Sequence, residues 1–305
     1  MQLFSLDLRK GFVKRRIKLT ISYDGSGYKG WQIQNPTSEK PEGDRPTIQG
    51  MLTLAIASLV KGGEVQLIGA SRTDSGVHAR GNVAVFDTES SIPVENFPFA
   101  INSFLPEDIR VLKAEEVDLD FNPRFVPHKK TYEYKVDNSL IQLPLNRLYS
   151  YNFTYALDLE KMREAAQYLV GEHDFTSFVN PDSQVFEHGG DAVREIYCVE
   201  ISGEKESTGE KSSTEEKLKK TEFSGGKAVK SRRVKDSDSQ LITIRISGNG
   251  FLYHMIRIIV GTLLQVGNGK RSPEEIKEIL ETRDRTKAGP TVPAKGLCLV
   301  ELCYP

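Results

Sequence analysis

The sequence predicts a globular fold of the α+β class. Apolar and polar residues alternate over residues 17–23 and 130–136, a pattern typical of half-buried strands, and residues 65–68 and 82–88 look like two further strands. Apolar residues recur at helical spacing over residues 48–59 and 159–170. Strands and helices follow one another without a regular strand–helix–strand repeat, and this order favours α+β over a parallel α/β fold.

Length and composition are those of an ordinary globular protein. The chain has 305 residues, of which 38% are hydrophobic and 27% charged, so it can bury a core in one large domain or in two fused domains. Its formal net charge is -1, so a nucleic-acid-binding surface would require an uneven placement of Lys and Arg.

The cysteines and the apolar segments exclude several classes of protein. Cys198, Cys298 and Cys303 fit neither a disulfide framework nor the spacing of a metal site, which indicates a reducing compartment. The longest apolar stretch, near residues 258–264, is too short to span a bilayer. Basic residues near the amino terminus are followed by the alternating segment 17–23, which is no signal-peptide core. We therefore expect a cytoplasmic protein without a membrane span.

The first expected elements are a strand and a capped helix. The strand at 17–23 should end in the turn Asp24-Gly25-Ser26-Gly27. Thr47 can cap a helix over residues 48–59, which Gly62-Gly63 would end.

A polar run lies between the next two expected strands, 65–68 and 82–88. It reads Ser71-Arg72-Thr73-Asp74-Ser75-Gly76-Val77-His78-Ala79. We expect it to form a loop held by the sheet, which is a common place for functional side chains.

The second half of the chain contains an expected insertion. After a helix over residues 159–170, the composition of residues 203–238 shifts to Lys, Glu, Ser, Thr and Gly with few large apolar residues. This composition predicts a disordered surface insertion, after which a strand at 241–246 resumes the fold.

The last expected elements are two helices and a strand. Gly250 should open a strongly apolar helix that runs to about residue 266. Ser272 should cap a second, amphipathic helix, with Pro273 at its first position and Glu275 at its third. Residues 297–302 supply a closing strand.

Arg257 interrupts the most apolar of these helices. A lone guanidinium buried there would be very costly, so it needs a carboxylate partner or a polar cleft. His254 and Gly261 fall on the same expected face, where Gly261 would let another backbone come close. Two interpretations stay open: Arg257 reaches solvent or a structural ion pair, or it meets a carboxylate in an active site. The sequence cannot choose that carboxylate among 42 acidic residues.

Asp74 and His78 are equally ambiguous when considered alone. An aspartate followed by Ser-Gly is ordinary turn chemistry, and most such residues accept backbone hydrogen bonds. A histidine on a loop is more often a hydrogen-bonding scaffold residue than a base, so we favour a scaffold role for His78.

A resemblance to a known family changes this balance. The run 72–79 resembles the signature of the TruA family of tRNA pseudouridine synthases, in which alanine usually stands at the position of Ser75. Further matching pieces follow in the order of the family and cover nearly the whole chain. They are Tyr23-Asp24-Gly25-Ser26 with Gly30-Trp31-Gln32, Thr47-Ile48-Gln49-Gly50, Lys130-Thr131-Tyr132-Glu133-Tyr134, His173-Asp174-Phe175-Thr176-Ser177-Phe178, Gly250-Phe251-Leu252-Tyr253-His254-Met255-Ile256-Arg257 with Gly261, and Pro293-Ala294-Lys295-Gly296-Leu297.

The resemblance implies the pseudouridine synthase fold. In that fold two similar mixed α/β subdomains, with antiparallel sheets, form one continuous sheet around a central RNA-binding cleft. We expect an N-terminal subdomain over residues 1–125, which carries the Asp74 loop, and a C-terminal subdomain over residues 126–305, which contains the insertion.

The resemblance also implies a role for each site residue. Asp74 is expected to be the essential catalytic carboxylate, and Arg257 its partner. Tyr132 is expected to stack on the base, and Leu297 to close the other side of the pocket. Arg72 is expected to occupy the space that the flipped uridine vacates. The alternative for Arg72 is a phosphate contact or a scaffold hydrogen bond.

By the same resemblance, the activity is the isomerisation of uridine to pseudouridine at positions 38, 39 and 40 in the anticodon arm of tRNA. The reaction implies no cofactor and no metal, and the enzyme is expected to be a homodimer. Basic residues that could contribute to the RNA surface are Lys10, Lys14, Arg15, Arg16, Lys29, Arg124, Lys129 and Lys130.

Two other functions are open to such a chain. The first is a catalytically inactive tRNA-binding or tRNA-chaperone module, against which the presence of Asp74, Tyr132 and Arg257 argues. The second is a retaining glycosidase, which needs two carboxyl groups about 5–5.5 Å apart. The region around Asp74 offers no paired acid nearby in sequence.

Overall fold

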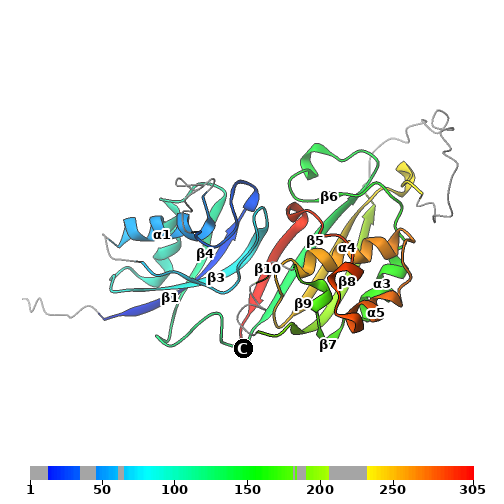
Figure 1. The fold of residues 1–305 in the computed structure, drawn as a ribbon. Coiled ribbons are helices and arrows are strands. Elements are labelled where there is room, and N and C mark those ends of the chain that lie inside the picture. The colour runs from blue at the N-terminus through cyan, green and yellow to red at the C-terminus, as the bar shows by residue number, and fades with distance from the viewer. Residues whose placement is uncertain (1–12, 35–45, 61–64, 181–182, 184–189, 206–231) are drawn as a thin grey trace, which may run out of the picture. The chain divides into compact units, whose positions relative to one another are not determined.

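The computed structural model describes residues 13–34, 46–60, 65–180, 183, 190–205 and 232–305. The chain divides into two compact units (Figure 1). The first consists of Met1–Lys130 together with Cys298–Pro305, and the second consists of Thr131–Leu297. The first unit therefore recruits the end of the chain as well as its beginning.

The first unit is built on a sheet in which β1 lies between β4 and β3 and is antiparallel to both. β10 pairs with β3 in parallel, and the short strand β2 pairs with β3 antiparallel. The strands are β1 (Arg15–Tyr23), β2 (Ile68–Gly69), β3 (His78–Thr88), β4 (Ile109–Val117) and β10 (Leu297–Cys303). The order β4-β1-β3-β10 places the start of β3 beside the start of β10.

The core of the first unit follows from the alternation in β1. Ile17, Leu19 and Ile21 are fully buried, as their period-2 spacing predicts. Helix α1 (Ile48–Leu59) begins after Thr47, whose side chain accepts a hydrogen bond from the backbone N–H of Gly50. The expected cap is thus confirmed. The short helix α2 (Phe97–Asn102) packs against α1 and β4.

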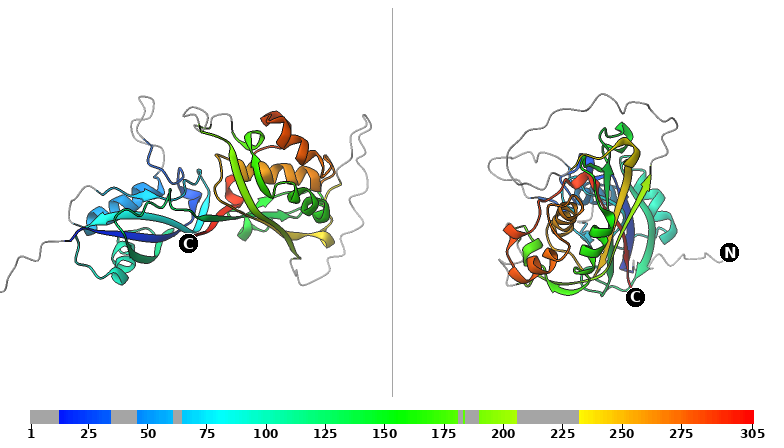
Figure 2. Two further views of the ribbon diagram at one scale, coloured as in Figure 1. Left: turned by 90° about the horizontal axis from the view of Figure 1, so that it is seen from below. Right: turned by 90° about the vertical axis from the view of Figure 1, so that its right-hand side faces the viewer.

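In the second unit, helices cover one face of a sheet (Figures 1 and 2). The strands run in the order β5-β9-β8-β7, with β8 antiparallel to both of its neighbours. They are β5 (Lys129–Asn138), β6 (Tyr151–Asn152), β7 (Gly171–Asp174), β8 (Val193–Lys205) and β9 (Gln240–Gly248), and β6 pairs with β5. The helices are α3 (Leu159–Gln167), α4 (Met255–Gly267) and α5 (Glu275–Thr282).

Helix α4 is the centre of the core of the second unit. Every residue of α4 is buried except Arg257 and Gln265, which are intermediate in exposure. The helix packs on α3, which also contacts β8. No helix in the described ranges combines the length and the apolarity needed to cross a lipid bilayer.

Some boundaries differ from the sequence-based expectation. α4 begins at Met255, not at Gly250, because His254 has a left-handed backbone with φ 63 and the segment before it is irregular. His78 and Ala79 are the first residues of β3, so the loop before β3 is shorter than expected.

The expected insertion at 203–238 also needs correction at both ends. Gly203 belongs to β8, where it pairs with Ile242. On the other side, Val234 is only 2% exposed and its N–H donates to the carbonyl oxygen of Thr154. Residues 206–231 lie outside the described residues.

Candidate active site

Asp74 is the first residue of a tight turn that leads into β3. The N–H of Val77 donates to the carbonyl oxygen of Asp74 at 3.1 Å, and Gly76 has φ 78. A positive φ at this position is adopted most easily by glycine. Turn chemistry therefore fixes the backbone of Asp74, whose side chain is intermediate in exposure.

The segment after β1 supports this turn from the side. The N–H of Trp31 donates to the carbonyl oxygen of Thr73 at 3.0 Å, and the hydroxyl of Ser75 donates to the carbonyl oxygen of Tyr28 at 3.2 Å. Gly30 has φ +90, and a Cβ at this position would lie 2.6 Å from the carbonyl oxygen of Thr73. Glycine is required here both for the backbone conformation and for the close approach of the two segments.

A buried polar network holds the residues before Asp74. The hydroxyls of Tyr23 and Thr73 are 2.8 Å apart. The side-chain amide of Asn82 donates to the Tyr23 hydroxyl at 3.2 Å and to the carbonyl oxygen of Ser71 at 3.1 Å. Asn82 is fully buried, so the loss of either bond would leave a buried polar group without a hydrogen-bond partner. This network joins β1, the Asp74 turn and β3.

His78 contributes to the same scaffold. Its Nδ1 accepts a hydrogen bond from the N–H of Gly25 at 3.1 Å, and it lies 3.1 Å from Oδ1 of Asp24. The ring is 6% exposed. A ring nitrogen that accepts from the backbone is committed to holding two segments together, which supports a scaffold role for His78.

Arg72 precedes this turn and is exposed, whereas its neighbours Ser71 and Thr73 are buried. The first unit thus holds two of the predicted site residues, Asp74 and Arg72, on one short segment. The side chain that could act on a sugar and the side chain that could replace a flipped base are two residues apart.

In the second unit, Arg257 is held at one edge of α4. Its Nε donates to the carbonyl oxygen of Val292 at 2.7 Å, and the N–H of Val292 lies 3.4 Å from the carbonyl oxygen of Arg257. A Cβ at Gly261, one turn further along, would overlap with the carbonyl group of Pro290. The expected close approach at Gly261 is confirmed, and the approaching segment also fixes the plane of the guanidinium.

The tyrosines of β5 lie near this edge of α4. Tyr132 is 6% exposed, and its ring meets that of Phe251 edge to face at 5.4 Å. The hydroxyl of Tyr134 donates to the carbonyl oxygen of Pro293 at 2.8 Å. Burial raises the pKa of Tyr134 well above its ordinary value, and the nearby Arg257 cation opposes this shift. Arg257 therefore lies within electrostatic reach of the Tyr134 hydroxyl.

Leu297 closes the same region of the second unit. It is 5% exposed and follows Gly296, which packs directly on the ring of Tyr134. Arg257 and the 290–297 segment, which ends at Leu297, thus lie near Tyr134, whereas the ring of Tyr132 packs on Phe251.

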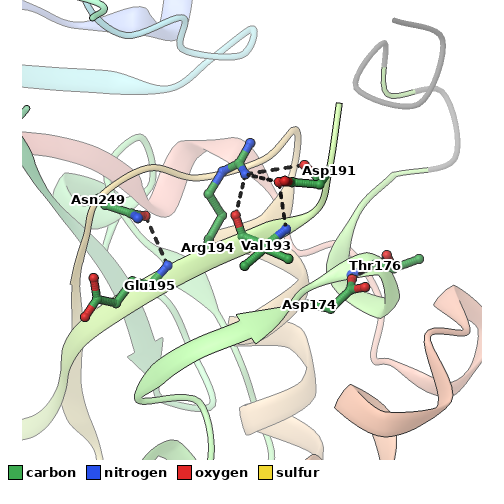
Figure 3. A network of polar contacts seen from close by, with 7 residues as sticks. All are labelled: Asp174, Thr176, Asp191, Val193, Arg194, Glu195 and Asn249. Atoms are coloured by element: carbon green, nitrogen blue, oxygen red, sulfur yellow. Dashed lines mark hydrogen bonds and ion pairs between the residues drawn. The ribbon is translucent and has the colours of Figure 1, made fainter. Parts of the chain in front are cut away.

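The segment that enters α4 is anchored to β8, as Figure 3 shows. Glu195 and Asn249 exchange two hydrogen bonds of 3.1 Å, one to the side chain of Asn249 and one from its backbone. Nearby, Arg194 bonds to Asp191 at 3.4 Å, with its side chain over Gly250. At the end of β7, the hydroxyl of Thr176 donates to Asp174 at 2.6 Å (Figure 3).

His254 does not share a helical face with Arg257. It caps α4 from a left-handed conformation, and its Nδ1 lies 2.9 Å from the side-chain amide nitrogen of Asn180. Its ring stacks on that of Tyr253 at 3.9 Å. His254 therefore helps to shape the start of α4.

Comparison with known proteins identifies the family. A family model described as tRNA pseudouridine synthase matches residues 19–126 and 165–305. The tRNA pseudouridine synthase A of Bacillus pumilus is 44% identical over 290 residues, which cover 95% of this chain and 99% of that protein. The chain belongs to the TruA family of tRNA pseudouridine synthases. Two further relatives are tRNA pseudouridine synthase A 2 of Clostridium perfringens, 42% identical, and tRNA pseudouridine synthase A of Caldicellulosiruptor bescii, 41% identical; each covers 95% of this chain and 100% of its own length.

Membership of the TruA family confirms the expected α+β class with mixed subdomains, and the chain is an isomerase of that family. The matched ranges of the family model include Arg72, Asp74, Arg257 and Leu297, whereas Tyr132 falls between them. No group of three or more His, Cys, Asp or Glu side chains that could hold a metal ion occurs within the described residues.

The sequence reasoning missed several residues that position the site of this TruA-family chain. Tyr134 belongs to the motif at residues 130–134, but nothing in the sequence indicated its bond to Pro293. The buried network of Tyr23, Thr73 and Asn82 was also missed, because it depends on contacts between distant parts of the chain. The signal that could have pointed to it is a buried asparagine within an apolar strand.

Proposed function

We propose that this chain isomerises uridine to pseudouridine in tRNA, at positions 38, 39 and 40 of the anticodon arm. The reaction breaks the bond between N1 of uracil and C1′ of ribose, turns the base, and joins C5 to C1′. C5 loses a proton and N1 gains one, so that nothing is oxidised and no group leaves. The observation that carries the proposal is a carboxylate, Asp74, on a turn held by backbone and side-chain hydrogen bonds in a chain of this family.

Asp74 supplies the carboxylate that acts on the ribose, either as a nucleophile at C1′ or as a base at C2′. Its rigid support favours this role, because a reacting group gains most when its position is fixed before substrate binds. The hydrogen bonds that fix the backbone of this turn come from neighbouring segments of the protein.

Arg257 is the partner of Asp74 in this proposal. A guanidinium on an otherwise buried helix favours an acceptor with negative charge, and its Nε bond to Val292 orients the rest of the group. An aligned guanidinium can hold a carboxylate ionised and in a single orientation.

Tyr132 and Leu297 form the two sides of the base pocket, and Arg72 occupies the space left in the stem after the uridine flips out. Extrusion of a stacked uridine costs a few kcal/mol, which a side chain inserted into the gap can offset. An exposed arginine two residues before the carboxylate is suited to this role.

The protein acts in the cytoplasm as a homodimer, with the anticodon arm of tRNA bound against basic residues of both subunits. Such RNA is recognised mainly through its shape and its backbone charge.

Conversion of a defined transcript tests the proposal. The purified chain is incubated with an unmodified tRNA transcript that carries uridine at positions 38 to 40, and pseudouridine is mapped at each nucleotide. We expect conversion at those positions and none in a transcript that carries cytidine there. Tight binding of the transcript without any conversion would instead identify a tRNA-binding module without activity.

A further inference from the structure

Cationic side chains gather on the segment that leads to the Asp74 turn. Nε of Arg124 donates to the carbonyl oxygen of Gly69 at 2.9 Å, and Nζ of Lys130 donates to the carbonyl oxygen of Ala70 at 3.2 Å. Arg72 follows on the same segment. All of these residues belong to the first unit.

The terminal nitrogens of Arg124 have no partner within the described residues. No carboxylate there forms an ion pair with Arg124 or with Arg72. Partial burial lowers the pKa of Arg124, and the positive charge of Arg72 lowers it further. Two arginines close enough to repel each other, without a carboxylate, favour the binding of an external anion.

Arg163 on α3 shows what a structural arginine of this kind looks like. Its Nε also donates to a backbone carbonyl oxygen, that of Ile201, at 2.9 Å. Its Nη1, however, bonds to the carboxylate of Glu160. Arg124 has the same backbone anchor without the carboxylate.

The backbone of Arg124 is also held in place. Its N–H donates to the side chain of Asn122 at 3.0 Å, and the N–H of Val126 donates to the carbonyl oxygen of Asn122 at 3.1 Å. The hydroxyl of Tyr304 donates to the carbonyl oxygen of Pro123 at 3.0 Å. With Nε anchored, little side-chain freedom remains to be lost when an anion binds.

We propose that Arg124 binds a backbone phosphate of the tRNA beside the uridine that reaches Asp74, with Arg72 and Lys130 adding to the attraction. This inference rests on the proposed function, which makes tRNA the substrate. A phosphodiester carries one negative charge and two free oxygens, which match the two terminal nitrogens of a guanidinium. Arg124 is thus a substrate-binding residue that holds the strand close to the catalytic turn.

The test compares Arg124→Gln with Arg163→Gln, which removes the same charge from an arginine already paired with Glu160. Dissociation constants for an unmodified tRNA are measured at several salt concentrations. For Arg124→Gln we expect affinity to fall about tenfold at low salt, as for the loss of one charged hydrogen bond. The slope of log Kd against log salt should fall by about one. Arg163→Gln should keep the slope of the wild type.

RNAs in which one backbone phosphate is replaced by an uncharged linkage locate the phosphate that Arg124 contacts. Anticodon-arm RNAs with a single methylphosphonate at successive positions are bound to the wild type and to Arg124→Gln. At one linkage near the target uridine the wild type should lose affinity, whereas the variant should lose none beyond its own defect. An unchanged salt slope for Arg124→Gln, or equal losses for both proteins at every linkage, would overturn the proposal.

A second variant distinguishes phosphate binding by Arg124 from a purely structural role of this residue. Arg124→Lys keeps the charge but loses the geometry of the anchor at Gly69, so it should retain most of the salt slope. If Arg124→Gln only lowers Tm and leaves the slope intact, the residue is structural and the phosphate site is wrong. Failure of the wild type to form pseudouridine would contradict the proposed function alone, since the binding result does not depend on turnover.

Discussion

The Asp74 turn and helix α4 place their charged side chains by different means. Asp74 stands on a turn whose shape depends on hydrogen bonds from the segment after β1, whereas Arg257 belongs to a helix that is buried almost throughout. A small change beside the turn can re-aim the carboxylate while the core stays intact. A comparable change beside α4 must disturb the core. Variants near the turn should therefore lower turnover more than stability, and variants near α4 the reverse.

The exception to this contrast is Arg257 itself, where we expect the largest loss of turnover among variants of α4. Arg257→Met should lower turnover by about 10²–10³-fold, because it removes the charged partner that we propose for the Asp74 carboxylate. Arg257→Lys should recover only part of this, since an ammonium cannot reproduce the planar guanidinium. Single-turnover assays with saturating tRNA measure both. Turnover of Arg257→Met within a few-fold of the wild type would show that Arg257 has only a structural role.

Gly261→Ala should show the sensitivity of the second unit. A methyl group here overlaps with the backbone of Pro290, so we expect the free energy of unfolding to fall by about 3 kcal/mol. Gly250→Ala is the matched control, because the nearest atom to its added Cβ would be 3.7 Å away on the Arg194 side chain. Denaturant unfolding compares the two. Equal stability of both variants would show that the contact at Gly261 is not tight.

Gly30→Ala should show the opposite behaviour in the first unit. The positive φ and the contact with Thr73 should cost about 2 kcal/mol of stability and shift the Asp74 turn. Turnover should fall more than tRNA affinity. Gly27→Ala, where no atom lies within 4 Å of the added Cβ, should leave both unchanged. A loss of stability in Gly30→Ala without loss of turnover would contradict the contrast between the two units.

Tyr134→Phe should have the smallest effect. It removes the hydrogen bond to Pro293, and we expect a loss of about 1 kcal/mol in unfolding free energy with little change in turnover. Tyr197→Phe, on an exposed ring, should be neutral. A large loss of turnover in Tyr134→Phe at unchanged stability would assign its hydroxyl a direct role in the reaction.

Local chemistry explains what the sequence could predict. The alternation in β1, the cap at Thr47 and the turn at Asp74 depend on neighbouring residues, and all are present. The start of α5 was predicted only in part: the N–H of Ser272 donates to the carboxylate of Glu275, but the N-cap residue is Glu274 and not Ser272. The helix itself begins three residues later than the expected cap.

Contacts between residues far apart in the chain explain the features that the sequence could not predict. The start of α4 is displaced because His254, whose ring nitrogen contacts Asn180, adopts a left-handed backbone, which no local pattern reveals. Strand β8 was missed, and a register shift between Ile196 and Cys198 interrupts its alternation. The choice of Asp74 came from the family signature, since as a turn residue it resembles many other aspartates of the chain.

We propose that the Asp74 carboxylate carries the reaction, and Asp74→Asn removes the charge of that carboxylate. Asparagine keeps the size of the side chain and removes its charge. We expect no pseudouridine in an unmodified tRNA transcript, with tRNA affinity within a few-fold of the wild type. Asp158→Asn, which exchanges one good helix cap for another at α3, should react normally. Undiminished conversion by Asp74→Asn would contradict the account.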